Sequence, residues 1–248
     1  MRNKHFLIIG GTHGIGKEIV RSLQSKKYHI TVVGRKTPDQ KQKKNINYWT
    51  IDLLDEKKLS TEIKNMLTKI GNISHIIFCQ RFRGSGDNWQ SEFQVSLTAT
   101  KQIIEETSSY FDTSKEKSIV IIASLASFFI GRDQPISYHV MKSALLQLVR
   151  YFAVTLGPLN IRVNSIAPCT ILKEESKHFY LDNKKLHSLY KRIIPLGRMG
   201  TAKEISDIAE FLCSSGSTFI TGQNIIADGG LSLISQERLA RDLSFGGN

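Results

Sequence analysis

The chain alternates short apolar runs, rich in isoleucine and valine, with longer segments of helical periodicity. This alternation constrains the fold more than any other feature, because strands that alternate with helices pair in parallel. Hydrophobicity within the runs is continuous, which is typical of strands covered on both faces. Seven such runs lie at residues 6–10, 30–34, 47–52, 75–79, 118–124, 161–167 and 224–228. We therefore predict an α/β, doubly wound fold with a mostly parallel, seven-stranded sheet.

The length and composition fit one folded domain. The 248 residues are 40% hydrophobic and 23% charged, which is ordinary for a globular protein, so we predict a single domain over residues 1–248. The segment 168–192 interrupts the alternation of strands and helices. A long irregular insertion after a strand is where a lid over a substrate cleft is expected.

The net charge and the cysteines limit the classes of partner. The formal net charge of +12 favours acidic partners such as phosphates or an acidic carrier protein, but lysines spread along the chain could equally form a solvated surface. No basic and aromatic stripe is present, so we expect no nucleic acid partner. The three cysteines form no CxxC pair, which argues against a disulfide framework and a metal site. Without a signal segment or an apolar span, we predict a cytoplasmic protein that does not bind membranes.

The stretch GGTHGIG, residues 10–16, lies between the first apolar run and the helix expected after it. Gly10, Gly14 and Gly16 allow a tight turn, a close approach of the backbone to a pyrophosphate, and packing of the helix on the strand. The helix N-terminus offers unpaired N–H groups to the anion. A glycine-rich turn can be purely structural, but this position between a strand and a helix favours dinucleotide binding in a Rossmann-type fold.

The residues after the second apolar run discriminate between nicotinamide cofactors. An acidic residue there would accept hydrogen bonds from the 2′-OH of NAD, whereas cations accommodate the 2′-phosphate of NADP. Here Gly34 leads into Arg35 and Lys36, with no acid before Asp39. We therefore predict a preference for NADP(H) over NAD(H).

Tyr138 and Lys142, in YHVMK, are four residues apart and so lie on one face of a predicted helix. A free phenol has a pKa of about 10 and is a poor acid–base group near neutrality, but an adjacent ammonium stabilises phenolate. Ser124 ends the fifth apolar run, where it could donate a hydrogen bond to a substrate carbonyl. Singly these are weak signals, because a Tyr–Lys pair at this spacing is often an ordinary surface pair.

In combination, these features resemble the classical short-chain dehydrogenase/reductase family, and the resemblance covers nearly the whole chain. The glycine-rich turn is similar to the family's TGxxxGxG, with Ile9 in place of the threonine. Ser124 and the YxxxK pair follow in the family's order. Three C-terminal segments also match closely: IRVNSIAP at 161–168, IPLGRMGTAKEI at 194–205 and ITGQNIIADGG at 220–230.

The resemblance implies a role for each matching residue. Tyr138 would be the general acid in reduction, Lys142 would stabilise its phenolate and hold the nicotinamide ribose, and Ser124 would orient the carbonyl. The family also commonly forms dimers or tetramers. A homodimer or homotetramer is therefore expected by analogy.

The resemblance also implies a set of cofactor contacts. Asp52 and Leu53 would contact the adenine, and the segment 168–171 the nicotinamide end, although Cys169 replaces the family's usual glycine. The full predicted set is Gly10, Thr12, His13, Gly14, Ile15, Gly16, Arg35, Lys36, Asp52, Leu53, Cys79, Gln80, Tyr138, Lys142, Pro168, Thr170 and Ile171.

Two positions depart from the family. Its Asn-Asn-Ala-Gly after the fourth strand aligns with Phe78–Arg81, and its catalytic asparagine, which holds a proton-relay water, aligns with Ser96. Backbone contacts to a cofactor survive the first change if the larger side chains point away. Ser96 can still hydrogen-bond a water, with a shorter reach, so we retain it as a candidate catalytic residue. Arg81 and Arg83 could clamp a carboxylate or phosphate of the substrate, or could be solvated loop residues.

We therefore predict an NADP(H)-dependent oxidoreductase that interconverts a carbonyl and a secondary alcohol with a tyrosine general acid/base. The alternative is a catalytically weakened dinucleotide-binding sensor or subunit. The joint presence of Ser124, Tyr138 and Lys142 favours the enzyme, because a binding module does not need the phenol. The substrate, small or carrier-bound, stays open among carrier-bound 3-oxoacyl groups, sugar derivatives and small ketones.

Overall fold

The structure, a computed structural model, describes residues 4–36, 45–84, 86–113 and 116–244. Its centre is a seven-stranded, all-parallel sheet in the order β3-β2-β1-β4-β5-β6-β9. The strands are β1 His5–Ile9, β2 His29–Gly34, β3 Ile46–Thr50, β4 His75–Phe78, β5 Lys117–Ile122, β6 Ile161–Pro168 and β9 Asn224–Ala227. All seven predicted runs are strands, and the predicted doubly wound fold is confirmed.

Both faces of the sheet are buried, which explains the continuous hydrophobicity of its strands. In β1, Leu7 and Ile9 belong to one hydrophobic core and Phe6 and Ile8 to a second, and none of the four is more than 2% exposed. Successive side chains of a strand point to opposite faces, so each strand supplies both cores. Helices must therefore cover the sheet on two sides.

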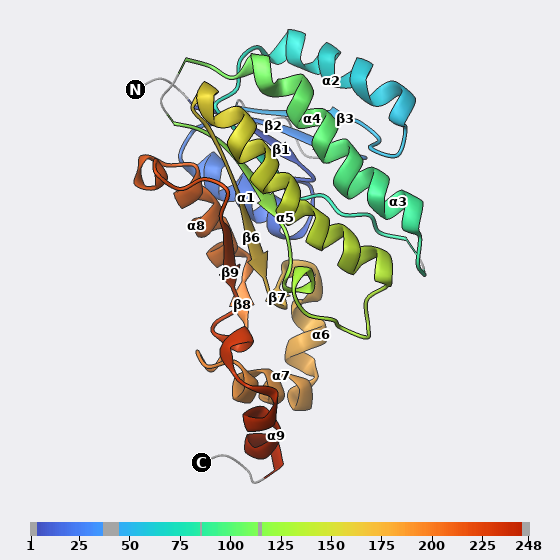
Figure 1. The fold of residues 1–248 in the computed structure, drawn as a ribbon, viewed down its shortest axis with the longest axis vertical. Helices are drawn as coiled ribbons and strands as arrows, with labels where there is room; N and C mark the ends of the chain where they lie inside the picture. The colour runs from blue at the N-terminus through green and yellow to red at the C-terminus, as the bar shows by residue number, and fades with distance from the viewer. Residues whose placement is uncertain (1–3, 37–44, 85, 114–115, 245–248) are drawn as a thin grey trace.

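Figure 1 shows those two helical layers. On one face α1, Gly14–Ser25, packs beside α8, Ala202–Leu212. The other face is covered by α2, Glu56–Ile70, α4, Ala99–Thr107, and α5, Ile136–Leu156. Within the part of the chain that the structure describes, no helix is long and apolar enough to cross a bilayer.

The sequence pattern suggested an irregular segment at 168–192, but most of this segment is regular structure. It contains β7, Ile171–Leu172, and two helices, α6, Lys177–Asp182, and most of α7, Lys184–Ile193. The Asn183 side chain accepts a hydrogen bond from the N–H of Leu186 and so caps α7. Strand β7 pairs with β8, Gly200–Thr201, in a separate two-stranded sheet.

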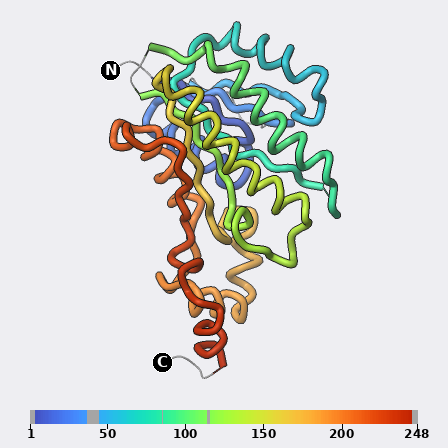
Figure 2. Tube along the Cα trace, viewed as in Figure 1, coloured from blue at the N-terminus to red at the C-terminus, as the bar shows by residue number. Residues whose placement is uncertain are grey.

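The C-terminal helix α9, Gln236–Ser244, lies beside α7 at the end of the molecule opposite α2, as Figure 2 shows. The two helices are joined by a hydrogen bond from Nη2 of Arg192 to the carbonyl of Asp242, 2.8 Å long. This end extends beyond the carboxyl edge of the main sheet. That the segment 168–192 acts as a lid over a substrate stays a prediction.

The strand order reverses between β1 and β4, which are neighbours in the sheet. Loops after such neighbours run to opposite faces, and the crevice between them is the usual ligand site of open α/β sheets. The glycine-rich turn follows β1. The loop at Phe78–Arg81, whose sequence differs from that of the family, follows β4. Both features that the sequence analysis singled out therefore meet at this crevice.

Candidate active site

The glycine-rich turn is shaped by contacts that leave no room for side chains. Gly10 has φ of 80°, and a Cβ there would lie 2.6 Å from the backbone nitrogen of Gln80. A Cβ on Gly16 would collide with the carbonyl oxygen of Gly10. Gly14 also has positive φ, 54°, at the first residue of α1. The turn is thus held tightly between β1 and the loop after β4, with the N-terminus of α1 facing the crevice.

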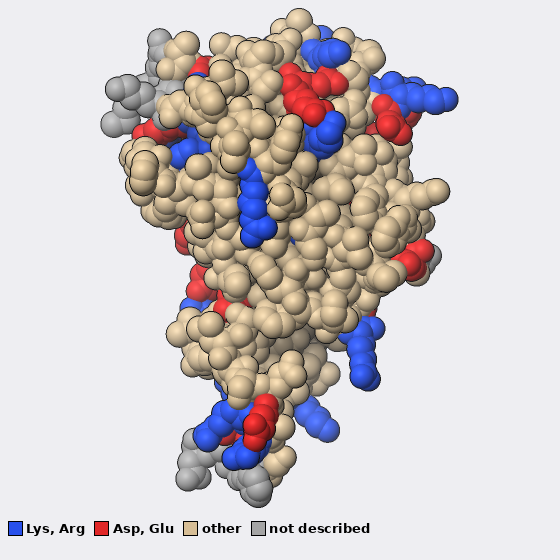
Figure 3. Space-filling model, viewed as in Figure 1, with Lys and Arg blue, Asp and Glu red and all other residues tan. Residues whose placement is uncertain are grey.

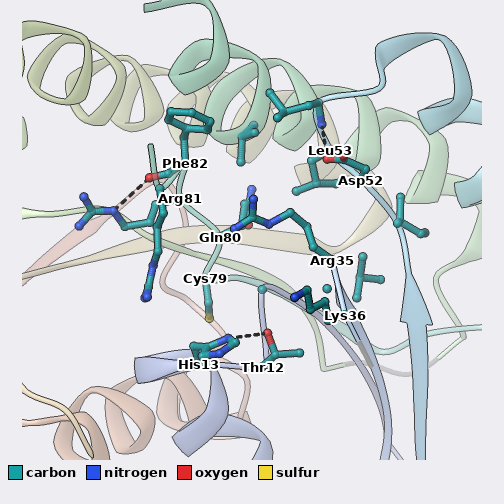
Figure 4. A pocket seen from close by; sticks show the side chains of 17 residues that line it. Thr12, His13, Arg35, Lys36, Asp52, Leu53, Cys79, Gln80, Arg81 and Phe82 are labelled. Atoms are coloured by element: carbon teal, nitrogen blue, oxygen red, sulfur yellow. Dashed lines mark hydrogen bonds between the residues drawn. The ribbon is translucent and has the colours of Figure 1, made fainter. Parts of the chain in front are cut away.

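A cavity of about 550 Å³ lies above this turn (Figure 4). Its walls come from the ends of β1, β2, β3 and β4, and the predicted cofactor residues among them are Gly10, Thr12, His13, Arg35, Lys36, Asp52, Leu53, Cys79 and Gln80. Figure 4 shows Arg35 extending toward the centre of the cavity, where Gln80 lies. An elongated nucleotide is of a size and polarity that such a cavity can hold.

Arg35 and Lys36 form the exposed rim of the cavity, directly after β2. The preceding Gly34 lies so close to Thr12 that a Cβ would be 2.8 Å from its methyl carbon. After the neighbouring strand β3, the Asp52 carboxylate accepts a hydrogen bond from the N–H of Leu54, which fixes the turn there. Two exposed cations therefore follow β2, and the carboxylate of Asp52 is bonded within its own turn.

The loop after β4 is fastened to the protein through its backbone and its side chains. The N–H of Cys79 bonds to the carbonyl of Ile9 at 2.8 Å, and Phe78 is 2% exposed in the core. Nε2 of Gln80 donates to Oγ1 of Thr100 in α4 at 2.7 Å. Phe78 is thus withdrawn into the core, whereas Gln80 is held by Thr100 but still lines the cavity.

Tyr138 and Lys142 lie together on α5. The Nζ of Lys142 is 5.7 Å from the centre of the Tyr138 ring and donates a 2.8 Å hydrogen bond to the carbonyl of Ile122 in β5. Lys142 is only 4% exposed, and burial lowers its pKa to about 8, helped by the charge of Arg81. The guanidinium carbon of Arg81 is 4.9 Å from the Tyr138 ring centre, on which it stacks.

Ser124 follows β5 and begins a 3₁₀ turn, Leu125–Ser127, in which its Oγ accepts a bond from the N–H of Ala126. Oγ of Ser127 donates to the carbonyl of Lys142 at 2.9 Å. This turn therefore fastens the end of β5 to α5. Ser124 lies two residues after Ile122, whose carbonyl accepts the Lys142 bond, and it lines neither the first cavity nor the second one described below. Its catalytic role stays a prediction.

Ser96 lies in a π-helical turn, Gln94–Thr98, between α3, Trp89–Phe93, and α4. Such turns are rare and occur frequently at functional sites. Ser96 is 1% exposed, and its Oγ donates a 2.9 Å hydrogen bond to the carboxylate of Glu92. Sequence reasoning missed Glu92, although its position four residues before Ser96 places the two side chains on one helix face.

A second cavity, of about 450 Å³, adjoins the first at Arg81 and Phe82, which line both. Its walls also include Tyr138, Glu92 and the exposed Asp133. The candidate general acid thus faces a space distinct from the cavity under Arg35. A substrate in the second cavity and a cofactor in the first would meet beside Tyr138.

The segment after β6 contacts the glycine-rich turn by a route that the sequence did not indicate. Oε1 of Glu175 accepts a 2.6 Å hydrogen bond from the N–H of Gly14. Burial raises the pKa of the Glu175 carboxyl, but the N–H groups of Glu175 and Gly14 and the charge of Arg83 lower it more, so it lies below its ordinary value. The carboxylate thus occupies the anion-binding end of α1.

Three further predicted residues lie at the end of β6 and just after it. Oγ1 of Thr170 accepts a 3.3 Å hydrogen bond from the phenol of Tyr190 in α7. Pro168 ends β6 and Ile171 begins β7, where it is 4% exposed. Pro168, Thr170 and Ile171 are not among the residues that line the two cavities described. Their assignment to the nicotinamide end stays a prediction.

Known proteins resemble this chain over nearly its whole length. Residues 10–232 match the profile of a family described as enoyl-(acyl carrier protein) reductase. The chain is 26% identical to isoepoxydon dehydrogenase of Penicillium expansum over 254 residues, 95% of this chain and 97% of that protein. It is 28% identical to 3-oxoacyl-(acyl carrier protein) reductase of Buchnera aphidicola over 243 residues, 93% and 98% of the two chains.

Among solved structures, 4-hydroxyisoleucine dehydrogenase complexed with NADH matches with a TM-score of 0.84 at 27% identity. The match covers 94% of this chain and 100% of that one. The sequence and structural relatives are thus named as dehydrogenases or reductases, and one of them was solved with a nicotinamide cofactor.

Proposed function

Because the chain belongs to the short-chain dehydrogenase/reductase family, we propose that it is an NADP(H)-dependent enzyme that interconverts a carbonyl and a secondary alcohol. Membership makes it an oxidoreductase with a fold that binds nicotinamide dinucleotides. The observation that carries the finer proposal is Lys142, a buried cation held beside Tyr138 at the carboxyl edge of the sheet.

In the proposed mechanism, Tyr138 gives its phenolic proton to the substrate oxygen during reduction and takes it back during oxidation. The Lys142 ammonium stabilises the phenolate, because opposite charges attract strongly in a site shielded from water. Ser124 donates a hydrogen bond to the same substrate oxygen. The nicotinamide, when bound, supplies or accepts the hydride at the carbonyl carbon.

The residues of the first cavity fit such a cofactor. The close contacts of Gly10 and Gly16 leave a bare backbone at the N-terminus of α1, as a pyrophosphate requires. Arg35 and Lys36 would receive the 2′-phosphate of NADP(H) from their exposed position after β2. This arrangement supports the preference for NADP(H) over NAD(H).

For the substrate we propose a carbonyl compound with an anionic group, recognised by Arg81 and Arg83. Arg81 lines both cavities and stacks on Tyr138, so its charge lies where the substrate would. Burial and the charges of Arg81 and Arg83 lower the pKa of the nearby Lys173, which indicates a crowded cationic surrounding. A carboxylate or phosphate would relieve that repulsion.

We also propose that the active protein is a homodimer or homotetramer. The outer face of α5 exposes Ile136, Val140, Tyr151 and Val154. Figure 3 shows the side of the molecule on which α5 lies in Figure 1. On this side the charged side chains lie mostly toward the margins, and few lie at the centre. Apolar surface of this kind is typical of an interface.

A screen of carbonyl compounds with consumption of NADPH as the readout tests the proposal most directly. It should include carrier-bound 3-oxoacyl groups, sugar derivatives and small ketones, each with and without an anionic group. Turnover that NADPH supports better than NADH, and that falls in Arg81→Ala, is the expected result. Tight binding of NADPH without turnover of any class would instead favour the dinucleotide-binding sensor or subunit.

A further inference from the structure

We propose that Glu92, held by Ser96 at the position of the family's relay asparagine, is a positioning residue that keeps Lys142 in its ammonium form. The inference rests on the proposed function for its catalytic meaning. It deepens that function by naming a residue outside the Ser124, Tyr138 and Lys142 set.

The first observation is a buried carboxylate without a salt bridge. Glu92 is 4% exposed, and none of the ion pairs found in the described part of the chain includes it. Ionised carboxylates are costly to bury unless a hydrogen bond or a nearby cation compensates. The Ser96 hydroxyl supplies the hydrogen bond, at 2.9 Å.

The second observation is that the nearby cation is Lys142. The segments that carry Glu92 and Ser96 both pack against α5. Burial lowers the pKa of Lys142 to about 8 and Arg81 lowers it further, while Glu92 and Cys79 act in the opposite direction. Glu92 and Tyr138 line the same cavity, and the Nζ of Lys142 is 5.7 Å from the centre of that tyrosine ring. Glu92 is thus a buried carboxylate on the side of α5 that carries Tyr138.

The third observation is a chain of hydrogen bonds that fixes the carboxylate. Nε2 of Gln80 donates to Oγ1 of Thr100 at 2.7 Å, and that hydroxyl donates to the backbone carbonyl of Ser96 at 2.7 Å. Ser96 then donates through its Oγ to Glu92. The chain begins at a residue of the first cavity and ends at a residue of the second. The hydrogen bond from Ser96 restricts the positions that the Glu92 carboxylate can adopt.

These observations give Ser96 a role that differs from that of the family's asparagine. A serine hydroxyl is too short to replace an asparagine amide, but it orients a carboxylate four residues earlier on the same helical face. The carboxylate acts on Lys142 through its charge. Glu92 would thus offset the destabilising effects of burial and of Arg81 on the ammonium.

The test measures the pKa of Lys142 directly, so it does not need a substrate. Protein labelled with ¹³C at lysine Cε is titrated by NMR, and the Lys142 signal is assigned by its absence in Lys142→Arg. In Glu92→Gln, which keeps an acceptor for Ser96 but removes the charge, the pKa of Lys142 should fall by about one unit. Glu105→Gln, an exposed glutamate in α4, is the matched control and should leave it unchanged.

An unchanged Lys142 pKa in Glu92→Gln overturns the inference, whatever happens to turnover. If the amide is not tolerated in the fold, Glu92→Met removes the same charge with a side chain of similar length, and the same fall is expected. The titration remains valid even if no substrate is ever found, so a failure here is distinct from a failure of the proposed function.

Once a substrate is known, the pH profile adds a second readout. The high-pH limb of kcat for reduction should move to lower pH in Glu92→Gln by the same amount as the Lys142 pKa. Ser96→Asn, which restores the family's residue, should recover part of the lost rate in Glu92→Gln. A uniform loss of rate with an unmoved profile would mean that Glu92 has only a structural role.

Discussion

Lys142 at the base of the cleft and Arg35 at its rim are two cations that we assign to one cofactor, yet their surroundings are opposite. Lys142 is 4% exposed, and its Nζ is bonded to the carbonyl of Ile122. Arg35 is exposed and follows the last residue of β2. Charges act strongly where water is excluded and weakly where it is not. We therefore expect the charge of Lys142 to act more strongly on a bound cofactor than the charge of Arg35 does.

The N-terminus of α1, near the rim, has a contact with which the pyrophosphate of a bound cofactor would compete. The Glu175 carboxylate bonds to the N–H of Gly14 at the N-terminus of α1, and Glu174 pairs with Lys17 in the same helix at 2.7 Å. A pyrophosphate would seek the same N–H group. At the base, the Nζ of Lys142 donates to a backbone carbonyl, and none of the ion pairs found among the described residues includes it. Substitutions should therefore have large effects at the base and small ones at the rim.

The largest effect is expected from Tyr138→Phe, which removes the phenolic oxygen and keeps the ring that Arg81 stacks on. Turnover should fall by about 10³-fold, because the proton donor is lost. Cofactor affinity, measured by quenching or enhancement of NADPH fluorescence, should stay within the error of the wild type. Retention of full activity would show that another group transfers the proton.

Lys142→Met should lower turnover by about 10²-fold and should also change how stability depends on pH. The pKa of Lys142 is about 8 in the folded protein, whereas an unfolded lysine has a pKa of about 10.4. Between these values the unfolded chain holds the proton that the folded protein has released. The free energy of unfolding of the wild type should therefore rise with pH in this window.

Chemical denaturation at a series of pH values, without cofactor, measures this difference. The stability of the wild type relative to Lys142→Met should increase from pH 8 upward. Parallel curves for the two proteins would mean that the folded Lys142 titrates like an exposed lysine. That outcome would remove the contrast between base and rim.

At the rim, Arg35→Ala should reduce the preference for NADPH over NADH by roughly fivefold, because an exposed charge pair is weakened by water and salt. Binding constants for both cofactors, at low and moderate ionic strength, give the ratio. The margin should narrow for the wild type as salt is added. Equal affinities of the unmodified protein for the two cofactors would contradict the assignment of Arg35 and Lys36 to the 2′-phosphate.

The smallest effect is expected from Glu175→Gln, which should tighten cofactor binding by about twofold, because a neutral amide competes less well for the N-terminus of α1. Isothermal titration with NADPH measures the change. Glu174→Gln, at the neighbouring exposed position, is the control for a general loss of negative charge. Weaker binding in Glu175→Gln alone would indicate that this carboxylate contacts the cofactor rather than competing with it.

The strands and the glycine-rich turn could be predicted because their signals are local. Continuous apolar runs report burial on both faces, and β1 to β6 and β9 form where such runs occur. The helix α7 could have been found in the segment expected to be irregular, since Asn183 caps it and Leu186, Tyr190 and Ile193 recur at helical spacing. The local signals for α7 are therefore present in the sequence.

Other features had no signal of this kind, because they join segments far apart in the chain. Glu175 and Gly14 are 161 residues apart, and their contact depends on where the segment after β6 lies. Arg81 and Tyr138 come from the loop after β4 and from α5, and only their packing places a guanidinium on the phenol ring. Glu92 reads as an ordinary polar helix residue until α3 is seen against α5.

The sequence by itself therefore determined the sheet, the bare backbone at the dinucleotide turn and the pairing of Tyr138 with Lys142, because periodicity and spacing act within one element. Only the tertiary structure decided which charges surround that pair. The burial of Lys142, the stacking of Arg81 on Tyr138 and the cavity that Glu92 shares with Tyr138 arise from three segments packed together. The strength of a charge depends on its distance from other charges and from water, and neither distance is encoded in any single segment.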